Sequence, residues 1–272
     1  MKVLRLFILH FWEAKTMLRM LYTDFRSTLL NRGIKILMLI FAAYIVGYVV
    51  LLKLVITLLN NGGSLTADDV LMVYNQSSIF VVTAATLIVY VGEFTNGSVR
   101  NKLCSGAKRS DIFLAAIINS AFLSFLMSMF CQMLEIVLAL IFTDGLHSQI
   151  LSEAAYSMLE TTISCTAIAV FSVGIIMIMG GNYASYIIGL GVAFLLKIFG
   201  MDVMRQLYPE KGPVTLTGTK LEVYRFFDKY VPYARCSGMP RWDMTSLLIG
   251  CAGLIIITTV IGLIIFDKKE LK

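Results

Sequence analysis

The sequence predicts an all-α integral membrane protein with six transmembrane helices, an N-terminal interfacial amphipathic helix and a short helix in a cytoplasmic loop. Hydrophobic residues make up 58% of the 272 residues and charged residues 15%, whereas soluble domains average nearer half and a quarter. Mean hydropathy is +0.82. Six apolar stretches are long enough to cross a bilayer, and they lack the period of two that barrel strands require. A soluble enzyme or a disordered chain is therefore not expected.

The six apolar stretches predict the order of the spans. Each has at least 18 residues and few charges, which meets the length criterion for a spanning helix. A backbone surrounded by lipid must satisfy its own hydrogen bonds, so helices are expected. The predicted spans are 34–59, 71–92, 112–143, 154–180, 183–200 and 246–266. Residues 34–272 are accordingly assigned to one transmembrane domain.

Lysine and arginine predict the orientation, because short loops rich in these residues stay in the cytoplasm. With the N-terminus inside, 13 of the 23 basic residues lie in the inner segments, which are 1–33, 93–111, 181–182 and 267–272. The outer loops 60–70 and 144–153 contain none. The long outer loop 201–245 contains seven bases and five acids, and long loops cross largely regardless of charge. Both termini are predicted to be cytoplasmic.

Residues 1–33 are predicted to form a separate segment that lies on the membrane. A cleaved signal peptide is disfavoured, because charges interrupt the apolar run and no small-residue cleavage site follows. A helix over about 15–31 would place bases and apolar residues on separate stripes, and a basic amphipathic helix lies at the anionic inner surface. The bases are Lys15, Arg19 and Arg26, and the apolar residues are Leu18, Tyr22, Phe25 and Leu29. A plain surface anchor is the simpler alternative.

The long outer loop 201–245 holds all four prolines of the chain. Residues 219–231 carry apolar side chains three or four apart, which predicts a short amphipathic helix. The loop is too charged along most of its length to form an apolar re-entrant helix.

Besides Lys35 at the edge of the first span, four charged residues lie well inside the predicted spans, where each costs about 2.5–3.5 kcal/mol on insertion scales. They are Lys53, Glu135, Glu160 and Lys197. From the helical rise of about 1.5 Å per residue, all four fall at a similar depth toward the outer face. We expect at least one ion pair among them. Its role is either a polar station on an export path or a packing pair, and the two lysines could instead snorkel to the headgroups.

The five cysteines and two histidines do not form a recognisable site. The cysteines are odd in number and contain no C-x-x-C pair, which argues against a disulfide framework or a zinc site. We expect no metal centre.

The stretch 93–111, EFTNGSVRNKLCSGAKRSD, is the most informative part of the chain. Two glycines flank a short helical piece, residues 98–104, directly after the second span. Such a helix can receive a push from another protein. A basic loop that only sets topology explains the charges equally well.

The string GSVRNKLCSGAKRSDIFLA resembles the corresponding loop of bacterial ABC transporter type 2 permeases. That family shows an acid at the end of the second span, a G-[ST]-[IV]-[RK]-N-K-L-like run, a glycine and a basic-polar pair entering the third span. The matching residues here are Glu93, Gly97, Ser98, Val99, Arg100, Asn101, Lys102, Leu103, Gly106, Lys108 and Arg109. The six spans, the N-terminal segment and the ending FDKKELK are also similar to the family.

The resemblance implies the permease subunit of an ATP-driven exporter. Such a subunit moves an amphiphilic substrate (a peptide, lipid-like molecule or drug) outward across the bacterial cytoplasmic membrane by alternating access. Two permease subunits, identical or related, would pair with two cytoplasmic ATPase subunits that bind ATP and Mg. This chain lacks G-x-x-x-x-G-K-[ST], so it is not expected to be an enzyme. No nucleic acid partner is expected.

By the family pattern, residues 98–104 would be the coupling helix that enters a cleft of the ATPase. Val99 and Leu103 would be its apolar contacts and Arg100 its polar contact, with Ser98 and Asn101 beside them. The amphipathic segment would lie next to this helix.

Three polar residues of the second span, Asn75, Ser78 and Thr86, are candidates for lining the pathway, because spans one, two and five line it in the family. Ordinary hydrogen bonding between helices is at least as good an explanation, at about 0.6 kcal/mol per bond. Two other function classes stay open. One is a non-transporting immunity or sensor protein, and the other is an intramembrane enzyme, although no span carries a nucleophile with a base.

Overall fold

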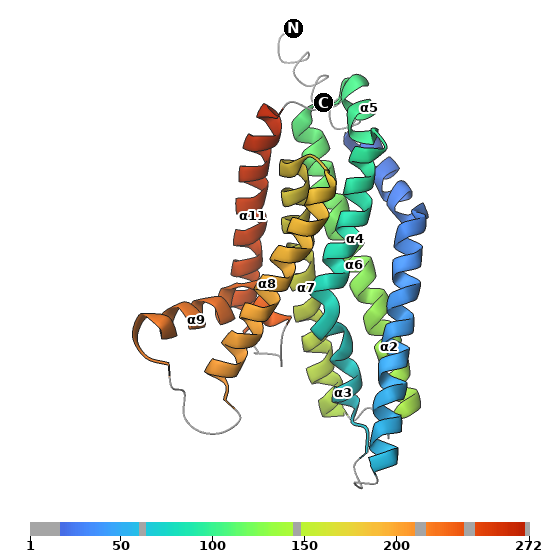
Figure 1. The fold of residues 1–272 in the computed structure, drawn as a ribbon, viewed down its shortest axis with the longest axis vertical. Coiled ribbons are helices and arrows are strands. Elements are labelled where there is room, and N and C mark those ends of the chain that lie inside the picture. The colour runs from blue at the N-terminus through green and yellow to red at the C-terminus, as the bar shows by residue number, and fades with distance from the viewer. Residues whose placement is uncertain (1–16, 60–63, 144–147, 210–215, 237–242, 270–272) are drawn as a thin grey trace.

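A computed structural model describes residues 17–59, 64–143, 148–209, 216–236 and 243–269. Figure 1 shows long helices running side by side, with shorter helices at both ends and on one flank. Residues 17–30 are helical. The helices that follow are α2 (Arg32–Leu59), α3 (Ala67–Leu71), α4 (Val73–Thr95), α5 (Ser98–Cys104), α6 (Arg109–Phe142), α7 (Ser148–Met179), α8 (Tyr183–Leu207), α9 (Gly218–Tyr230), α10 (Pro232–Arg235) and α11 (Met244–Lys268).

The described residues contain six helices that are long and apolar enough to cross a membrane, which confirms the predicted fold class. Their bounds are Arg32–Leu58, Ala67–Thr95, Arg109–Phe142, Ser152–Met179, Tyr183–Leu207 and Met244–Lys268. The second of these joins α3 to α4 across Met72. Thr66 starts it with a capping box, because its side chain and that of Asp69 each accept a hydrogen bond from the other residue's backbone N–H.

Two helices, α4 and α7, form the centre of the bundle. In the most apolar 18-residue window of each span, 61% of the residues are buried in the span that contains α4 and 67% in the span that contains α7. The corresponding share is 11% in α2 and in α11. Small side chains allow close packing around α7. Gly174 leaves no room for a Cβ beside Thr258 of α11, and Gly262 of α11 leaves none beside Phe113 of α6. The hydrophobic core therefore depends on close contacts among α6, α7 and α11.

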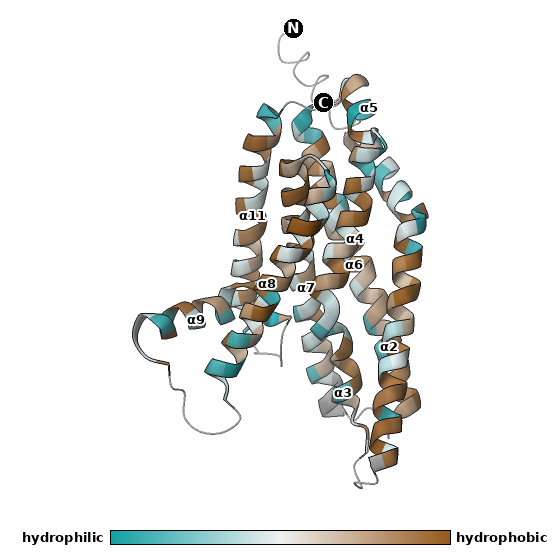
Figure 2. Ribbon diagram, viewed as in Figure 1, coloured by the Kyte–Doolittle hydropathy of each residue, from teal (hydrophilic) through white to brown (hydrophobic). Residues whose placement is uncertain are grey.

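The outer helices present apolar side chains to the surroundings. Leu39 and Leu58 of α2 are 72% and 74% exposed, and Figure 2 shows hydrophobic residues along most of α2 and α11. Exposing such a large apolar surface to water would be unfavourable, whereas a lipid bilayer accommodates it. The distribution fits a multi-pass membrane protein.

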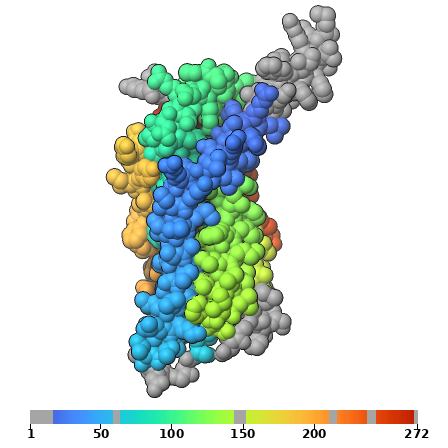
Figure 3. Space-filling view, turned by 90° about the vertical axis from the view of Figure 1, so that its right-hand side faces the viewer, coloured from blue at the N-terminus to red at the C-terminus, as the bar shows by residue number. Residues whose placement is uncertain are grey.

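The predicted short helices are confirmed where they are described. Residues 17–30 lie within the predicted segment 15–31 and are helical, and Figure 3 shows them crossing the end of the bundle beside the atoms of α5. The helix predicted over 219–231 is α9. Residues 1–16 lie outside the described part of the chain.

Within residues 201–245, the predicted outer loop, the structure differs from the expectation in two ways. The fifth span continues as α8 to Leu207. Farther along, all four residues of α10 are buried, because α10 packs against α7 and α8. The charged residue that α10 carries into the bundle, Arg235, pairs there with Glu160.

Candidate functional site

The candidate site is the end of the bundle formed by α5, the N-terminal helix and the last residues of α11. Figure 1 shows α5 at the same end as the C-terminal end of α11. Gly97 and Gly106 flank α5 with φ of 71° and 90°, in the left-handed region that glycine adopts without a steric penalty. These two residues let the chain turn sharply into and out of a seven-residue helix.

One face of α5 anchors it to the spans. Val99 is buried in the main core cluster, where it joins residues of α4 and α6 such as Val91 and Ile112, and Leu103 packs against the same cluster. The two apolar side chains lie on the face of the helix that covers the ends of α4 and α6. Val99 is thus buried within the bundle and Leu103 is half-buried, so their expected contact with an ATPase stays a prediction.

The opposite face of α5 is open. Arg100, Asn101 and Cys104 are exposed, and Ser98 is half-buried. Cys104 is also the exposed member of the five free cysteines, since the other four are buried. Any partner that docks on α5 from outside the bundle would meet this polar face.

A single lysine connects α5 to two other helices. The Nζ of Lys102 lies 2.8 Å from Asp24 of the N-terminal helix and 3.0 Å from Glu93 near the end of α4. Burial alone would lower the pKa of the Lys102 ammonium, but the two carboxylates outweigh it and hold that pKa above its usual value. The three groups form a partly buried network of ion pairs with charge-assisted hydrogen bonds. Asp24 was not predicted from the sequence, although it is the one acid within residues 17–30.

A second polar tie fixes the N-terminal helix to the spans. The amide of Asn119 on α6 donates to Thr28 Oγ1 at 2.9 Å and to Tyr90 OH at 3.1 Å, and Tyr90 OH donates to the carbonyl of Ala116 at 2.7 Å. All of these groups are buried. The N-terminal helix is thus held at two points, Asp24 and Thr28, one helical turn apart.

Basic residues also donate hydrogen bonds to backbone carbonyls at the C-terminal ends of two spans. Arg109 donates from one nitrogen to the carbonyls of Phe266 (3.2 Å), Asp267 (3.0 Å) and Lys269, at the end of α11. Lys269 donates to the carbonyl of Ile178 at 2.6 Å, near the end of α7. Burial lowers the pKa of Lys269. Cations placed here complement the negative C-terminal ends of the helices, so these residues have a structural role besides any role in topology.

The expected ion pair among Lys53, Glu135, Glu160 and Lys197 does not form. Lys53 donates to the carbonyl of Phe142 at 3.3 Å and Lys197 to that of Cys236 at 2.8 Å. Glu135 accepts a hydrogen bond from the backbone N–H of Tyr74, and Glu160 pairs with Arg235 at 2.9 Å. Each side chain meets a partner outside this set of four: a backbone carbonyl for the two lysines, a backbone N–H for Glu135 and Arg235 of α10 for Glu160.

Arg235 is another site residue that the sequence did not predict. Its side chain is 2% exposed and that of Glu160 is 5% exposed. It also donates to the carbonyl of Lys229 at 3.1 Å. Together with the bond from Lys197 to Cys236, this pair holds α10 between α7 and α8. A basic residue just after Pro232 in a loop gives no sign by itself that it is buried.

The three candidate pathway residues lie in the interior of one chain. Asn75, Ser78 and Thr86 are all buried on α4. Ser78 Oγ donates to the carbonyl of Asn75 at 2.9 Å, and Thr86 Oγ1 donates to that of Thr83 at 2.8 Å. Because α4 is surrounded by α2, α6, α7 and α8, these side chains do not line an open path in this conformation.

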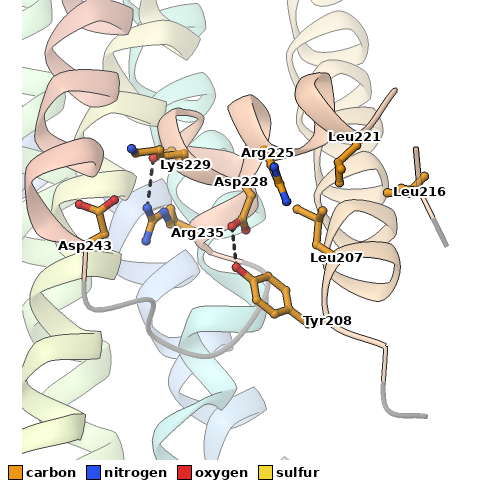
Figure 4. A pocket seen from close by; sticks show the side chains of 9 residues that line it. All are labelled: Leu207, Tyr208, Leu216, Leu221, Arg225, Asp228, Lys229, Arg235 and Asp243. Carbon is orange, nitrogen blue, oxygen red and sulfur yellow. Dashed lines mark hydrogen bonds between the residues drawn. The ribbon is translucent and has the colours of Figure 1, made fainter. Parts of the chain in front are cut away.

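Two cavities adjoin α9 at the flank of the bundle. Figure 4 shows a polar cavity of about 590 Å³, whose lining includes Arg225, Asp228, Lys229, Arg235 and Asp243. The second cavity, about 680 Å³, is lined by apolar residues of α7, α8, α9, α10 and α11.

Within the described residues, no group of three His, Cys, Asp or Glu side chains could hold a metal ion. No protein-family model matches the chain, and no curated protein is significantly similar to it.

Proposed function

We propose that this protein is the membrane-spanning subunit of an ATP-driven exporter and that α5 couples it to a cytoplasmic ABC ATPase. The observation that carries the proposal is the attachment of α5. This short helix is bound to three helices by Lys102 and by the packing of Val99, while its polar face is left open. A force applied to that face would be transmitted to α4, α6 and the N-terminal helix as one body.

The proposed contact surface follows from exposure. Arg100 and Asn101 would make the polar contacts with the ATPase, and Val99 and Leu103 would hold the helix in place from behind. ATP and Mg would be bound by the ATPase, and a second permease subunit would complete the transporter. Resemblance to type 2 permeases supports this function through residues 93–111. The substrate class, an amphiphile, rests on that resemblance alone.

The first test concerns the side of the membrane on which α5 lies. Cys104 is a native reporter, because the other four cysteines are buried. A membrane-impermeant maleimide should label Cys104 in inverted vesicles and leave it unlabelled in intact cells, and Cys104→Ser should abolish the signal. Labelling from outside the cell would overturn the proposal.

The second test concerns the partner. The tagged chain should co-purify from its native membranes with a protein that hydrolyses ATP. Arg100→Glu should reduce the recovered ATPase at least tenfold, because a like-charge contact in an interface costs several kcal/mol. Lys220→Glu, the same kind of charge reversal on α9, serves as the matched control and should leave recovery unchanged. A chain that purifies without an ATPase, or equal recovery from both variants, would refute the coupling role.

A further inference from the structure

The apolar cavity beside α9 lies where a bilayer would reach it. Its walls are α8 and α11, both candidate spans, with Phe171 of α7 behind them. Ile249 and Ile257 on its α11 side are 60% and 58% exposed. The cavity is therefore continuous with the apolar surface that faces lipid. Its volume of about 680 Å³ falls in the range of roughly 300–1,000 Å³ that small-molecule sites occupy.

The helix α9 separates this cavity from the polar one. Phe226, Phe227 and Tyr230 line the apolar cavity, whereas Arg225 and Lys229 line the polar cavity. The polar cavity also holds Asp228, Arg235 and Asp243, so it carries charges of both signs. An apolar space and a charged space on the two sides of one amphipathic helix match a ligand with a hydrocarbon chain and a charged headgroup.

The charges at the boundary point to the headgroup. In the polar cavity, Arg235 is paired with Glu160, and Asp228 accepts a hydrogen bond from Tyr208. Asp243 caps α11, and after its hydrogen bonds to Ser246 the charge of Lys229 also lowers the pKa of its carboxyl. The ammonium of Lys229 lies 5.5 Å from the ring centre of Tyr230, which lines the apolar cavity. Figure 4 shows Lys229 extending from α9 toward α11. In the described part of the chain, no carboxylate lies within 4 Å of this ammonium.

We propose that this flank binds a phospholipid, with one acyl chain in the apolar cavity and the phosphate at Lys229. The leaflet involved is the one farther from α5. A lysine ammonium is a common phosphate ligand as a point charge, and cations near a membrane surface bind anionic lipid groups. This proposal does not depend on the exporter function, because it needs neither an ATPase nor a substrate.

A glycine in the wall of the cavity offers a clean way to fill it. Gly253 lines the apolar cavity, and a Cβ at this position would meet no atom within 4 Å. Gly253→Leu would place a side chain in the open space without a clash at its Cβ. Gly47 of α2 is equally open and exposed, so Gly47→Leu is the matched control for added apolar bulk.

The test measures lipid retention on the full-length protein by native mass spectrometry. The probes are dioleoylphosphatidylglycerol and dioleoylglycerol, which share their chains and differ in the phosphate headgroup. Gly253→Leu should reduce retention of both lipids at least fivefold, and Gly47→Leu should retain both as the wild type does. Retention by Gly253→Leu equal to that of the wild type would overturn the chain site. A change of oligomeric state in Gly253→Leu alone would also overturn it, since a second copy would then be the occupant.

A second pair of variants tests the phosphate. Lys229→Gln should lower retention of the phospholipid about fivefold, as expected for one cation near the surface, and leave dioleoylglycerol unchanged. Lys220→Gln is the control, because Lys220 lies on the same helix, 5.3 Å from the ring centre of Tyr224, and lines neither cavity. An equal effect of Lys229→Gln on both lipids, or no effect on either, would overturn the assignment of the phosphate to Lys229.

Discussion

Replacement of Arg235 by methionine would measure how much the buried ion pair with Glu160 contributes to holding α10 in the bundle. The two side chains are 2% and 5% exposed and 2.9 Å apart. Methionine keeps most of the apolar stem but leaves the Glu160 carboxylate buried without the guanidinium. Removing one partner of a buried pair typically costs about 3–5 kcal/mol. The bond from Arg235 to the carbonyl of Lys229 would be lost as well.

The measurement is thermal unfolding of the purified protein in detergent. A loss of this size should lower Tm by roughly 10 °C, since about 1 kcal/mol shifts Tm by roughly 2–4 °C in chains of comparable length. Arg225→Met is the matched control. Arg225 is 64% exposed and lies 3.9 Å from Glu222, and such surface pairs contribute about 0–1 kcal/mol.

The double variant Glu160→Gln with Arg235→Met distinguishes the pair from simple packing. Removing both charges should restore much of the stability, because no uncompensated ion is left in the interior. If Arg235→Met unfolds at the same temperature as Arg225→Met, the pair does not hold α10. If the double variant is as unstable as the single one, the loss comes from packing and not from the charge.

The remaining predictions concern the contact between α9 and α11 and the lysine that ties α5. Gly250→Ala should destabilise the protein by about 1–3 kcal/mol, because its Cβ would overlap the backbone carbonyl of Tyr230, whereas Gly253→Ala meets open space; equal Tm values would contradict the close approach. Lys102→Met should lower the free energy of unfolding by about 1–3 kcal/mol and raise the labelling rate of Cys104. An unchanged labelling rate would show that α5 stays in place without the ion pairs of Lys102. With its pKa raised in the folded state, Lys102 stabilises the protein at neutral pH and loses this effect as the pH rises through that raised value. The wild type should therefore approach the stability of Lys102→Met only above pH of about 10, and convergence near neutral pH would contradict the assignment.

The elements were predictable because each depends on local sequence. Apolar runs of spanning length gave the six long helices, and the spacing of apolar residues in 219–231 indicated α9. Gly97 and Gly106 marked the ends of α5 because a left-handed backbone favours glycine. The predicted ends differed from the observed ones by a few residues, and by about two turns for α8, because its last turns are polar but remain hydrogen-bonded as a helix.

The sequence by itself determined the class of the protein, the number of its spans and the location of the short helix between the second and third. Only the tertiary structure decided which charges meet. Depth along a span was enough to place Glu160 and Lys197 near one level, but it could not reveal that α10 enters the bundle and brings Arg235 to Glu160. Likewise, the spacing of apolar residues along α5 did not reveal which face of the helix points into the bundle. Packing against α4 and α6 buries Val99 there, so that it holds α5 in place. The physical reason is that hydropathy and helical period are local properties, whereas the partner of a buried charge depends on how distant segments pack together.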